Sequence, residues 1–336
     1  MIKLLQSKLL KIIFGIIVVI VVSVRACNSC ATSSEKKTNA QQPQAQQSYE
    51  NTSQVDLAQR NAIQESSKLA ISNDNIFKPI IDSLLQRGVA SEFIEKYVIR
   101  DNAKFDEKYV KINVTGFLRR ADYSYATSDI AIRRSKAFFR DNATALIAAE
   151  KKYNVPREII VSILWIETRL GSYLGKNHLP SVFFSTALVN EAEFIEVNNR
   201  VVAESDNTDS MKNVLRGRVK QRSENKAKWA IGELAAMYEI EKKYGIDFNQ
   251  VNGSWAGAFG ISQFLPSSFL HYAVDGNNDG KIDLFNIEDA IFSVANYLKE
   301  HKWGNTTEQK RKAIWRYNNS NAYVDAVLKL GELIKK

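Results

Sequence analysis

The chain has 336 residues, of which 45% are hydrophobic, so it can bury a substantial core in one large domain or two modest ones. Its net charge of +9 comes mostly from scattered lysines, which fits either a lysine-rich composition or attraction to an anionic polymer outside the cytoplasm. The sequence has no glycine-rich phosphate loop and no basic stripe interleaved with aromatic residues, which excludes nucleic acid as a partner, and its two cysteines and three histidines argue against zinc chemistry.

The first segment, residues 1–30, has the pattern of an export signal or membrane anchor. A leader with three lysines precedes an uncharged apolar run at 12–24, which is short for a spanning helix of ~20 residues. The sequence "VRAC" ending at Cys27 is similar to the site where bacterial lipoproteins are cut and acylated, although Arg25 stands where a small residue is usual. Acylation of Cys27, a retained anchor and plain cleavage all remain open, and each places the rest of the chain in the cell envelope, on the periplasmic side or secreted.

A polar tether and a helical region follow. Residues 31–66 are rich in Gln, Ser, Asn and Thr and nearly free of large apolar side chains, so they predict a disordered tether. Residues 67–150 form the N-terminal helical part, with two short helical patterns split at Gly88 and a longer one over 131–153. The main candidate for a strand is "KYVKINV" at 108–114.

The remaining segment, 151–336, has the strongest helical periodicity. Asn154 is a plausible cap and Pro156 suits a first helical turn. We expect helices from Pro156 to Leu170, from Lys226 to Tyr244 and over 287–301. The chain is therefore predicted to be mainly α-helical, with little β-structure and no internal repeat.

Glu167 is the first candidate for chemistry. On a helix it shares a face with Ile163, Leu164 and Leu170, so the face is apolar. Burial and the unpaired carbonyls of the helix C-terminus both raise the pKa of a carboxyl group, which a general acid acting on a glycosidic oxygen requires. Arg169 projects about 200° away around the helix and is not expected to pair with it. The alternative is an ordinary helix-end glutamate that reaches solvent.

A second candidate site lies at 252–269, "NGSWAGAFGISQFLPSSF". Its glycines let the backbone approach a ligand or another element closely. Ser254 and Gln263 could hydrogen-bond sugar hydroxyls, and Trp255 and Phe259 offer apolar ring faces beside them. The alternative is a tight helix-packing loop, which explains the glycines but explains Ser254 and Gln263 less well.

Together these segments carry a resemblance. The sequence "VPREIIVSILWIETRLGSYLGK" followed by "GSWAGAFGISQFLPSS", "HYAVDGNNDGKIDLFNIEDAIFSVANYLKEHKW" and "WRYNNSNAYVDAV" resembles the lytic murein transglycosylase B family over roughly residues 66–336. The resemblance implies a lysozyme-like catalytic core at 151–336 with an additional helical subdomain and an EF-hand-like loop. It makes Glu167 the sole catalytic acid and gives five residues substrate-binding roles: Ser254, Gln263, Tyr317, Asn318 and Tyr323. A family tyrosine upstream of the acid has no clear counterpart here, because Tyr123 and Tyr125 do not align cleanly.

The resemblance also implies a reaction. A hydrolytic glycosidase usually needs two carboxylates, and we find one good candidate. A lytic transglycosylase manages with one, because the N-acetyl group of N-acetylmuramic acid (MurNAc) stabilises the cationic centre and the sugar's C6 hydroxyl replaces water. The product end is then 1,6-anhydromuramoyl, and the partner is the peptidoglycan glycan strand. The alternatives are a hydrolytic muramidase, a non-catalytic wall-binding or scaffold module, and a calcium-responsive structural protein.

A loop at 275–289, "DGNNDGKIDLFNIED", has the spacing of a calcium site. Oxygen ligands at alternate positions are offered by Asp275, Asn277 and Asp279, with the carbonyl of Lys281 next. Asn286 stands where an EF-hand has glutamate, and the family resemblance implies that Asp289 closes a longer loop instead. The alternative for Asp289 is a helix-capping role. Carboxylates gathered in one loop repel each other, which favours a structural Ca²⁺ or Na⁺.

Overall fold

The computed structural model describes residues 61, 69, 71, 72, 74–118 and 121–335, all of which belong to one unit of packed elements, Leu57–Lys336. The predicted signal or anchor at 1–30, and the predicted tether at 31–66 apart from Asn61, lie outside these described residues. In the described part of the chain, no helix combines the length and the apolar character needed to cross a membrane. The domain boundaries expected from the sequence therefore stay predictions.

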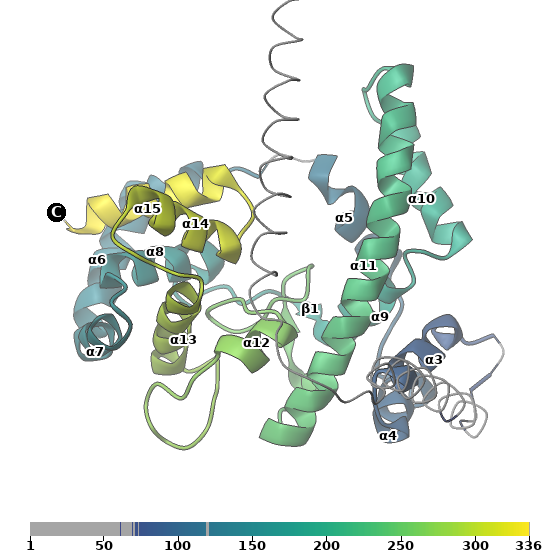
Figure 1. Cartoon of the computed structure of the whole chain (residues 1–336), viewed down its shortest axis with the longest axis horizontal. Helices are drawn as coiled ribbons and strands as arrows, with labels where there is room; N and C mark the ends of the chain where they lie inside the picture. The colour runs from purple at the N-terminus through teal and green to yellow at the C-terminus, as the bar shows by residue number, and fades with distance from the viewer. Residues whose placement is uncertain (1–60, 62–68, 70, 73, 119–120, 336) are drawn as a thin grey trace, which may run out of the picture. The chain divides into compact units, whose positions relative to one another are not determined.

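The described residues are mostly helical, as predicted (Figure 1). The first half contains α3 (Lys78–Gln86), α4 (Ser91–Ile94), the π-helix η1 (Glu95–Ile99), α5 (Glu107–Thr115), the 3₁₀ helices η2 (Gly116–Leu118) and η3 (Ser124–Thr127), α6 (Asp129–Asp141) and α7 (Ala143–Tyr153). The second half contains α8 (Arg157–Thr168), α9 (Leu179–Ala187), α10 (Ala192–Ala203), α11 (Asp209–Tyr244), the 3₁₀ helix η4 (Phe248–Gln250), α12 (Pro266–Tyr272), α13 (Ile287–Glu300), α14 (Thr307–Tyr317) and α15 (Asn321–Lys335). Two short strands, β1 (Asn177–His178) and β2 (Asn252–Gly253), pair antiparallel with Asn177 opposite Gly253.

The predicted strand at 108–114 is wrong, because this segment lies within helix α5. Asp106 caps the helix by accepting a hydrogen bond from the Lys108 amide at 2.9 Å. The buried side chains recur at helical spacing, at 109–110 and at 113–115, and this helix packs against α9, α10 and α11. Tertiary packing on one helical face therefore overrides the β-propensity of the valines, isoleucine and tyrosine in this segment.

Several helix boundaries also differ from the sequence prediction, and α11 begins at Asp209 instead of Lys226. The helix expected over 131–153 is divided into α6 and α7 at Asn142, whose side-chain amide donates to the Phe138 carbonyl at 3.0 Å. Asn154 does not cap α8; it ends α7 in a left-handed conformation with φ 55°. Pro156 takes the N-cap position of α8 instead of a first-turn position. Both asparagines stop a helix, since short polar side chains compete for backbone hydrogen bonds and tolerate left-handed φ.

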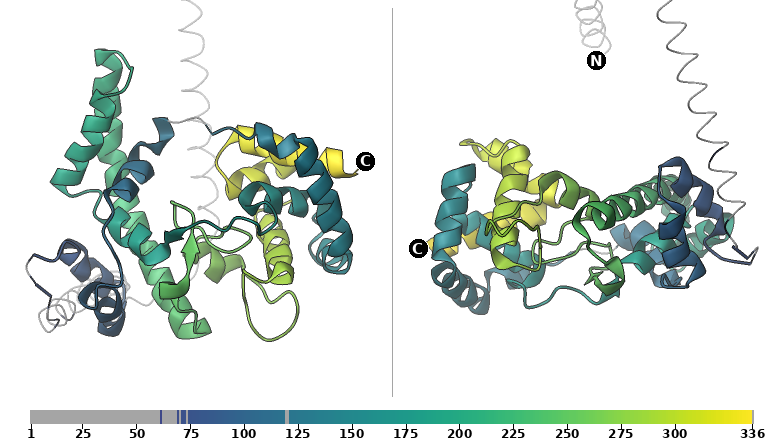
Figure 2. Two further views of the ribbon diagram at one scale, coloured as in Figure 1. Left: turned by 180° about the vertical axis from the view of Figure 1, so that it is seen from behind. Right: turned by 90° about the horizontal axis from the view of Figure 1, so that it is seen from below.

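The helices pack as two groups that meet beside α12 (Figures 1 and 2). In the first group α8 contacts α6, α7, α13 and α15, and Ile160, Val161, Ile163 and Leu164 on this helix are fully buried. In the second group the 36-residue α11 contacts α3, α5, α9 and α10. Helix α12 contacts both α11 and α13, so it joins the two groups. The end of α8 and the middle of α11 are thereby held on rigid supports.

Candidate active site

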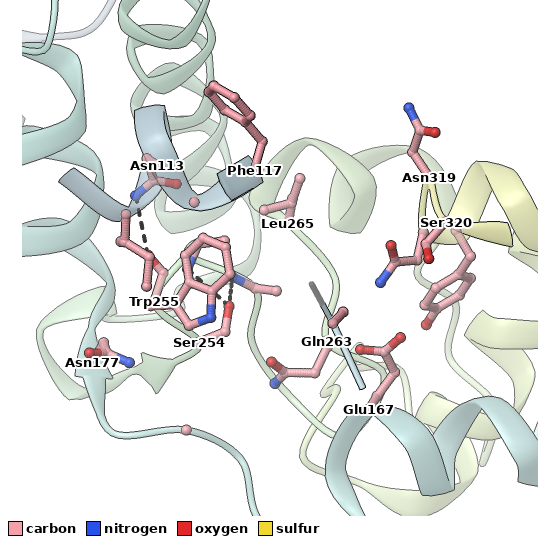
Figure 3. A pocket seen from close by; sticks show the side chains of 18 of the residues that line it. Asn113, Phe117, Glu167, Asn177, Ser254, Trp255, Gln263, Leu265, Asn319 and Ser320 are labelled. Carbon is pink, nitrogen blue, oxygen red and sulfur yellow. Dashed lines mark hydrogen bonds between the residues drawn. The ribbon is translucent and has the colours of Figure 1, made fainter. Parts of the chain in front are cut away.

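A cleft of about 770 Å³ contains the end of α8 (Figure 3). Glu167, Asn319 and Ser320 lie on one side of the cleft, and Asn113, Phe117 and Trp255 lie on the other. Its lining comes from α5 and η2, the last turn of α8, the loop between β2 and α12, helix α11 and the segment after α14. Segments spread over more than 200 residues of sequence therefore meet at Glu167.

The position of Glu167 is fixed by the way α8 ends. Arg169 and Leu170 take left-handed conformations with φ of 51° and 60°, which stops the helix directly after Thr168. The Thr168 hydroxyl, which is buried, donates to the Ile261 carbonyl at 2.9 Å and accepts from the Gly171 amide at 2.9 Å. These bonds connect the end of α8 to the loop that carries Gln263.

The electrostatic surroundings of Glu167 favour its neutral form. The side chain as a whole is partly exposed, but protein atoms surround its carboxyl group, and this burial raises its pKa from 4.5 to about 7. The Tyr323 hydroxyl donates to Oε1 at 2.5 Å, which lowers the pKa of Glu167 but does not offset the burial. Within the described part of the chain, no cation, Arg169 included, lies within ion-pair distance of this carboxylate.

Glu167 is the sole acidic side chain among the described residues that line the cleft. A second buried glutamate, Glu233 on α11, lies outside this lining and is 3% exposed. Its two carboxylate oxygens accept from the Ser267 amide at 2.8 Å and the Ser267 hydroxyl at 2.7 Å. Glu233 therefore anchors the start of α12 and is not placed to act as a partner for Glu167.

Ser254 and Gln263 both line the cleft, as expected from the sequence. The Ser254 oxygen accepts from the amides of Ala256 and Ala258 at 3.3 and 3.1 Å, which leaves its own proton free to donate. Gln263 has a left-handed backbone, with φ 51°, and its amide nitrogen donates to the carbonyls of Gly260 and Leu174 at 3.0 and 3.3 Å. Its side-chain oxygen therefore stays available as an acceptor.

The two aromatic residues of this loop separate. Trp255 is 47% exposed and lies over the cleft beside Ser254 (Figure 3). Phe259, which the sequence analysis placed beside the ligand, is buried at 1% exposure between Phe248 and Phe269. The glycines serve close packing, since a Cβ at Gly257 would lie 2.1 Å from the Phe183 ring. Trp255 is therefore placed for sugar contact, whereas Phe259 and Gly257 serve tight packing.

The residues after α14 lie close to the acid but differ in what they contact. Tyr317 and Asn318 line the cleft, and the Tyr317 hydroxyl donates to the Ser262 carbonyl at 2.5 Å. Tyr323 is 1% exposed and directs its hydroxyl to Glu167, so it touches the acid from behind the cleft surface. Of the two tyrosines left unassigned by the sequence, Tyr123 lines the cleft, lies 3.5 Å from the Asn318 amide nitrogen and packs edge-on against the Tyr323 ring.

The sequence analysis missed many of the lining residues, among them Asn113, Phe117, Arg222 and Lys226. Asn113 is 2% exposed and its amide nitrogen donates to the Thr186 hydroxyl at 3.1 Å and the Trp255 carbonyl at 3.3 Å. Its side-chain oxygen is buried without a partner among the described residues. No sequence signal pointed to these residues, because they lie in helical segments where the surrounding sequence contains no motif.

The comparisons with known proteins agree with this geometry. A family model described as the transglycosylase SLT domain matches residues 76–312, which is well over half of the chain. The chain belongs to this transglycosylase family. It is 32% identical over 172 residues to the membrane-bound lytic murein transglycosylase B of Escherichia coli, and the match spans 51% of this chain but only 38% of the relative.

Solved structures share the fold of this SLT-domain chain. Soluble lytic transglycosylase SltB1 from Pseudomonas aeruginosa has a TM-score of 0.56 at 23% identity, over 74% of this chain and 93% of that one. SltB3 from the same organism, solved in complex with NAG-anhNAM-pentapeptide, has a TM-score of 0.57 at 19% identity, over 77% of this chain and 78% of that one. These likenesses confirm the predicted lysozyme-like, mostly helical fold.

The predicted metal loop of the SLT-domain chain carries the expected oxygen donors but does not gather them around one point. Within the described ranges, no group of three or more Asp, Glu, His or Cys side chains is placed to hold an ion. The carboxylates bind amides instead: Asp275 accepts from Gly280 at 2.8 Å, and buried Asp289 accepts from Gly276 at 2.8 Å and Asp283 at 2.7 Å. The lytic transglycosylase Slt35 of E. coli, solved in complex with calcium, has a TM-score of 0.50 at 21% identity, over 82% of this chain and 92% of that one.

Proposed function

We propose that this chain is a peptidoglycan lytic transglycosylase that cleaves the bond between MurNAc and N-acetylglucosamine (GlcNAc) and leaves 1,6-anhydromuramoyl ends. The observation that carries the proposal is the single carboxyl group in the cleft, Glu167, with a pKa raised to about 7 and no second acid beside it among the described lining residues. A retaining or inverting hydrolase needs two carboxyl groups on either side of the bond, about 5–9.5 Å apart.

In this reaction Glu167 first acts as a general acid and then as a base. Protonated below pH 7, it gives its proton to the glycosidic oxygen. The bond from C1 of MurNAc to this oxygen breaks, GlcNAc leaves as the alcohol, and the MurNAc N-acetyl oxygen stabilises the positive charge at C1. The carboxylate then takes the proton of the C6 hydroxyl as that oxygen bonds to C1. The hydrogen bond from Tyr323 supports the carboxylate formed between the two steps, because it stabilises the ionised form. The tethered C6 hydroxyl has the effective-molarity advantage of an intramolecular nucleophile.

Neutral polar groups and one aromatic face are available for the sugars. Ser254 donates, the Gln263 oxygen accepts and Trp255 offers a ring to an apolar sugar face. We assign Tyr317 and Asn318 to the same substrate-binding set, and Tyr323 to the positioning of Glu167. Support comes from SltB3, whose complex holds an anhydro-muramoyl peptide in a related fold.

The test is the chemical nature of the new chain ends. Purified sacculi are digested with the protein, and the products are analysed by mass spectrometry. Anhydro ends are expected, and reducing muramic acid ends, heavier by one water, would assign a hydrolytic muramidase instead. A protein that binds sacculi but releases no fragment would be a wall-binding scaffold.

A structural Ca²⁺ in the loop at 275–289 is part of the proposal. The donor chemistry fits a hard cation, since Asp275, Asn277, Asp279 and Asp289 supply oxygen and Lys281 supplies a carbonyl. Asp279 accepts from the Lys281 amide at 2.8 Å, so the side chains would have to turn from amides toward the ion. Such an ion would stabilise the loop by neutralising its carboxylates; it has no step in the cleavage.

We further propose that the chain works in the cell envelope, attached to the membrane by residues 1–30 and a tether at 31–66. The apolar run and Cys27 support this arrangement, and the E. coli relative is described as membrane-bound. Residues 67–150 would then form an N-terminal helical part and 151–336 the catalytic core. Incorporation of radiolabelled palmitate that is lost on Cys27→Ala would identify a lipid anchor.

A further inference from the structure

The N-terminal half of α11 extends past the cleft and carries a row of exposed or partly exposed side chains that begins outside the site described above and ends at its edge. Met211, Val214, Arg218 and Arg222 follow one another at spacings of three or four residues, so they lie on one side of the helix. Met211 is 47% exposed and Val214 is 65% exposed. Arg222 lines the cleft, so this side of the helix continues the wall of the cleft outward.

Two arginines of this row are held by one aromatic ring. The guanidinium carbons of Arg218 and Arg222 lie 4.2 and 4.8 Å from the centre of the Phe117 ring, at the cleft edge labelled in Figure 3. Arg222 also donates from Nε to the Val114 carbonyl at 2.8 Å and from Nη2 to the Asn113 carbonyl at 3.4 Å. The row is therefore fixed by the end of α5 before any ligand arrives.

Neither guanidinium is neutralised within the described part of the chain. Among the described residues, no carboxylate lies within 4.0 Å of Arg218 or Arg222, and none accepts a hydrogen bond from Arg218. Burial, and then the charge of Arg218, lower the pKa of Arg222, which reflects two like charges close together. Such a pair favours an anion, and a guanidinium with free N–H donors suits a carboxylate in particular.

We propose that Arg218 and Arg222, held against Phe117, bind a free carboxylate of a stem peptide on the glycan strand. This inference rests on the proposed function, because it takes the strand in the cleft to be peptidoglycan. A muramic acid whose carboxylate is amide-linked to a peptide has no charge of its own. The regularly repeated carboxylates of the glycan strand therefore belong to the stem peptides. Met211 and Val214 add an apolar surface that suits the alanine methyl groups of such a peptide.

Equilibrium binding to two kinds of soluble glycan strand tests the inference. One preparation keeps its free stem-peptide carboxylates, and in the other these carboxylates have been converted to amides, because removal of the peptides by an amidase would free the lactyl carboxylate of each MurNAc. The full chain is used in detergent with Glu167→Gln as the parent, so that the strands stay intact. Arg218→Gln should weaken binding to strands with free stem-peptide carboxylates about two- to fivefold, the upper part of the range for one exposed ion pair, and leave binding to the amidated strands unchanged. Arg218→Lys should recover part of the loss.

Arg216→Gln is the matched control, since Arg216 is exposed on the same helix, points to a different side and bonds Asn213 at 2.9 Å. It should change binding to neither strand. Equal loss on both strands after Arg218→Gln, or no loss on either, would overturn the inference while leaving the proposed function intact. A parent that binds neither preparation, together with a wild-type chain that cleaves neither, would overturn both.

Discussion

Replacing Glu167 by glutamine tests both the role of this residue in cleavage and the effect of its burial on the free energy of unfolding. The amide keeps the shape of the side chain and can still accept the hydrogen bond that Tyr323 donates at 2.5 Å. It cannot donate a proton to a glycosidic oxygen and cannot ionise. Cleavage of sacculi should therefore be lost, while the fold is retained.

The same substitution should change the stability of the protein in a pH-dependent way. The pKa of Glu167 is raised from 4.5 to about 7, so the folded protein keeps a proton that the unfolded chain releases above pH 4.5. At about 1.4 kcal/mol per pKa unit, the wild type loses about 3 kcal/mol of unfolding free energy as the pH rises from 4.5 to 7. Glutamine loses none, so Glu167→Gln should be about as stable as the wild type at pH 4.5 and more stable above pH 7.

Chemical denaturation at pH 4.5, 6 and 8 measures this difference, with a melting temperature higher by roughly 5–10 °C at pH 8 as a second readout. Glu158→Gln on the same helix is a control for loss of a carboxylate outside the cleft. A stability difference between Glu167→Gln and the wild type that does not grow with pH would refute the burial of an acid at this position. Activity of Glu167→Gln near that of the wild type would remove the residue from the reaction.

Three further outcomes are expected. Tyr323→Phe removes the bond that stabilises the ionised form, so the pKa of Glu167 should rise further and the alkaline fall of the cleavage rate, near pH 7 in the wild type, should move to higher pH; an unmoved profile would contradict this. Thr168→Val leaves the Ile261 carbonyl unpaired, and should cost about 1–3 kcal/mol in urea unfolding and lower kcat; unchanged kcat would show that this bond does not position the acid. Calcium added after chelation should raise the melting temperature of the wild type but not of Asp289→Asn, and equal responses would place the ion elsewhere.

Some residues of the site could be recognised from short patterns in the surrounding sequence. Glu167 could be found because one helix pattern, its stop signal and the apolar neighbours at 163 and 164 all lie within a few residues of it. Ser254 and Gln263 could be found because polar residues stand out in a loop of small ones. Each of these candidates was found from periodicity or composition over less than twenty residues, and its role came from the family resemblance carried by four separate motifs.

The opposite wall of the cleft could not be predicted in this way. Asn113 lies in a segment whose residue types favour a strand, and it is helical because α9, α10 and α11 bury one face of it. Tyr123 lines the cleft and packs against the ring of Tyr323 on α15, which lies 200 residues further along the chain. Arg222 reaches the cleft through a helix of 36 residues whose start lies far from it. These positions depend on long-range packing, which leaves no pattern in the local sequence.

The acid and the calcium-like loop, which share no neighbouring residues in the sequence, are joined through one peptide segment. The Ile261 amide donates to the Leu284 carbonyl at 2.8 Å, and the Ile261 carbonyl accepts from Thr168, the residue after Glu167. Leu284 follows Asp283, whose amide donates to Asp289 inside the loop. A cation that draws the loop carboxylates together would therefore act on Ile261 from one side, while α8 holds it from the other. Its effect on cleavage would come from the placement of Glu167, since these backbone segments would separate the ion from the glycosidic oxygen and prevent direct contact.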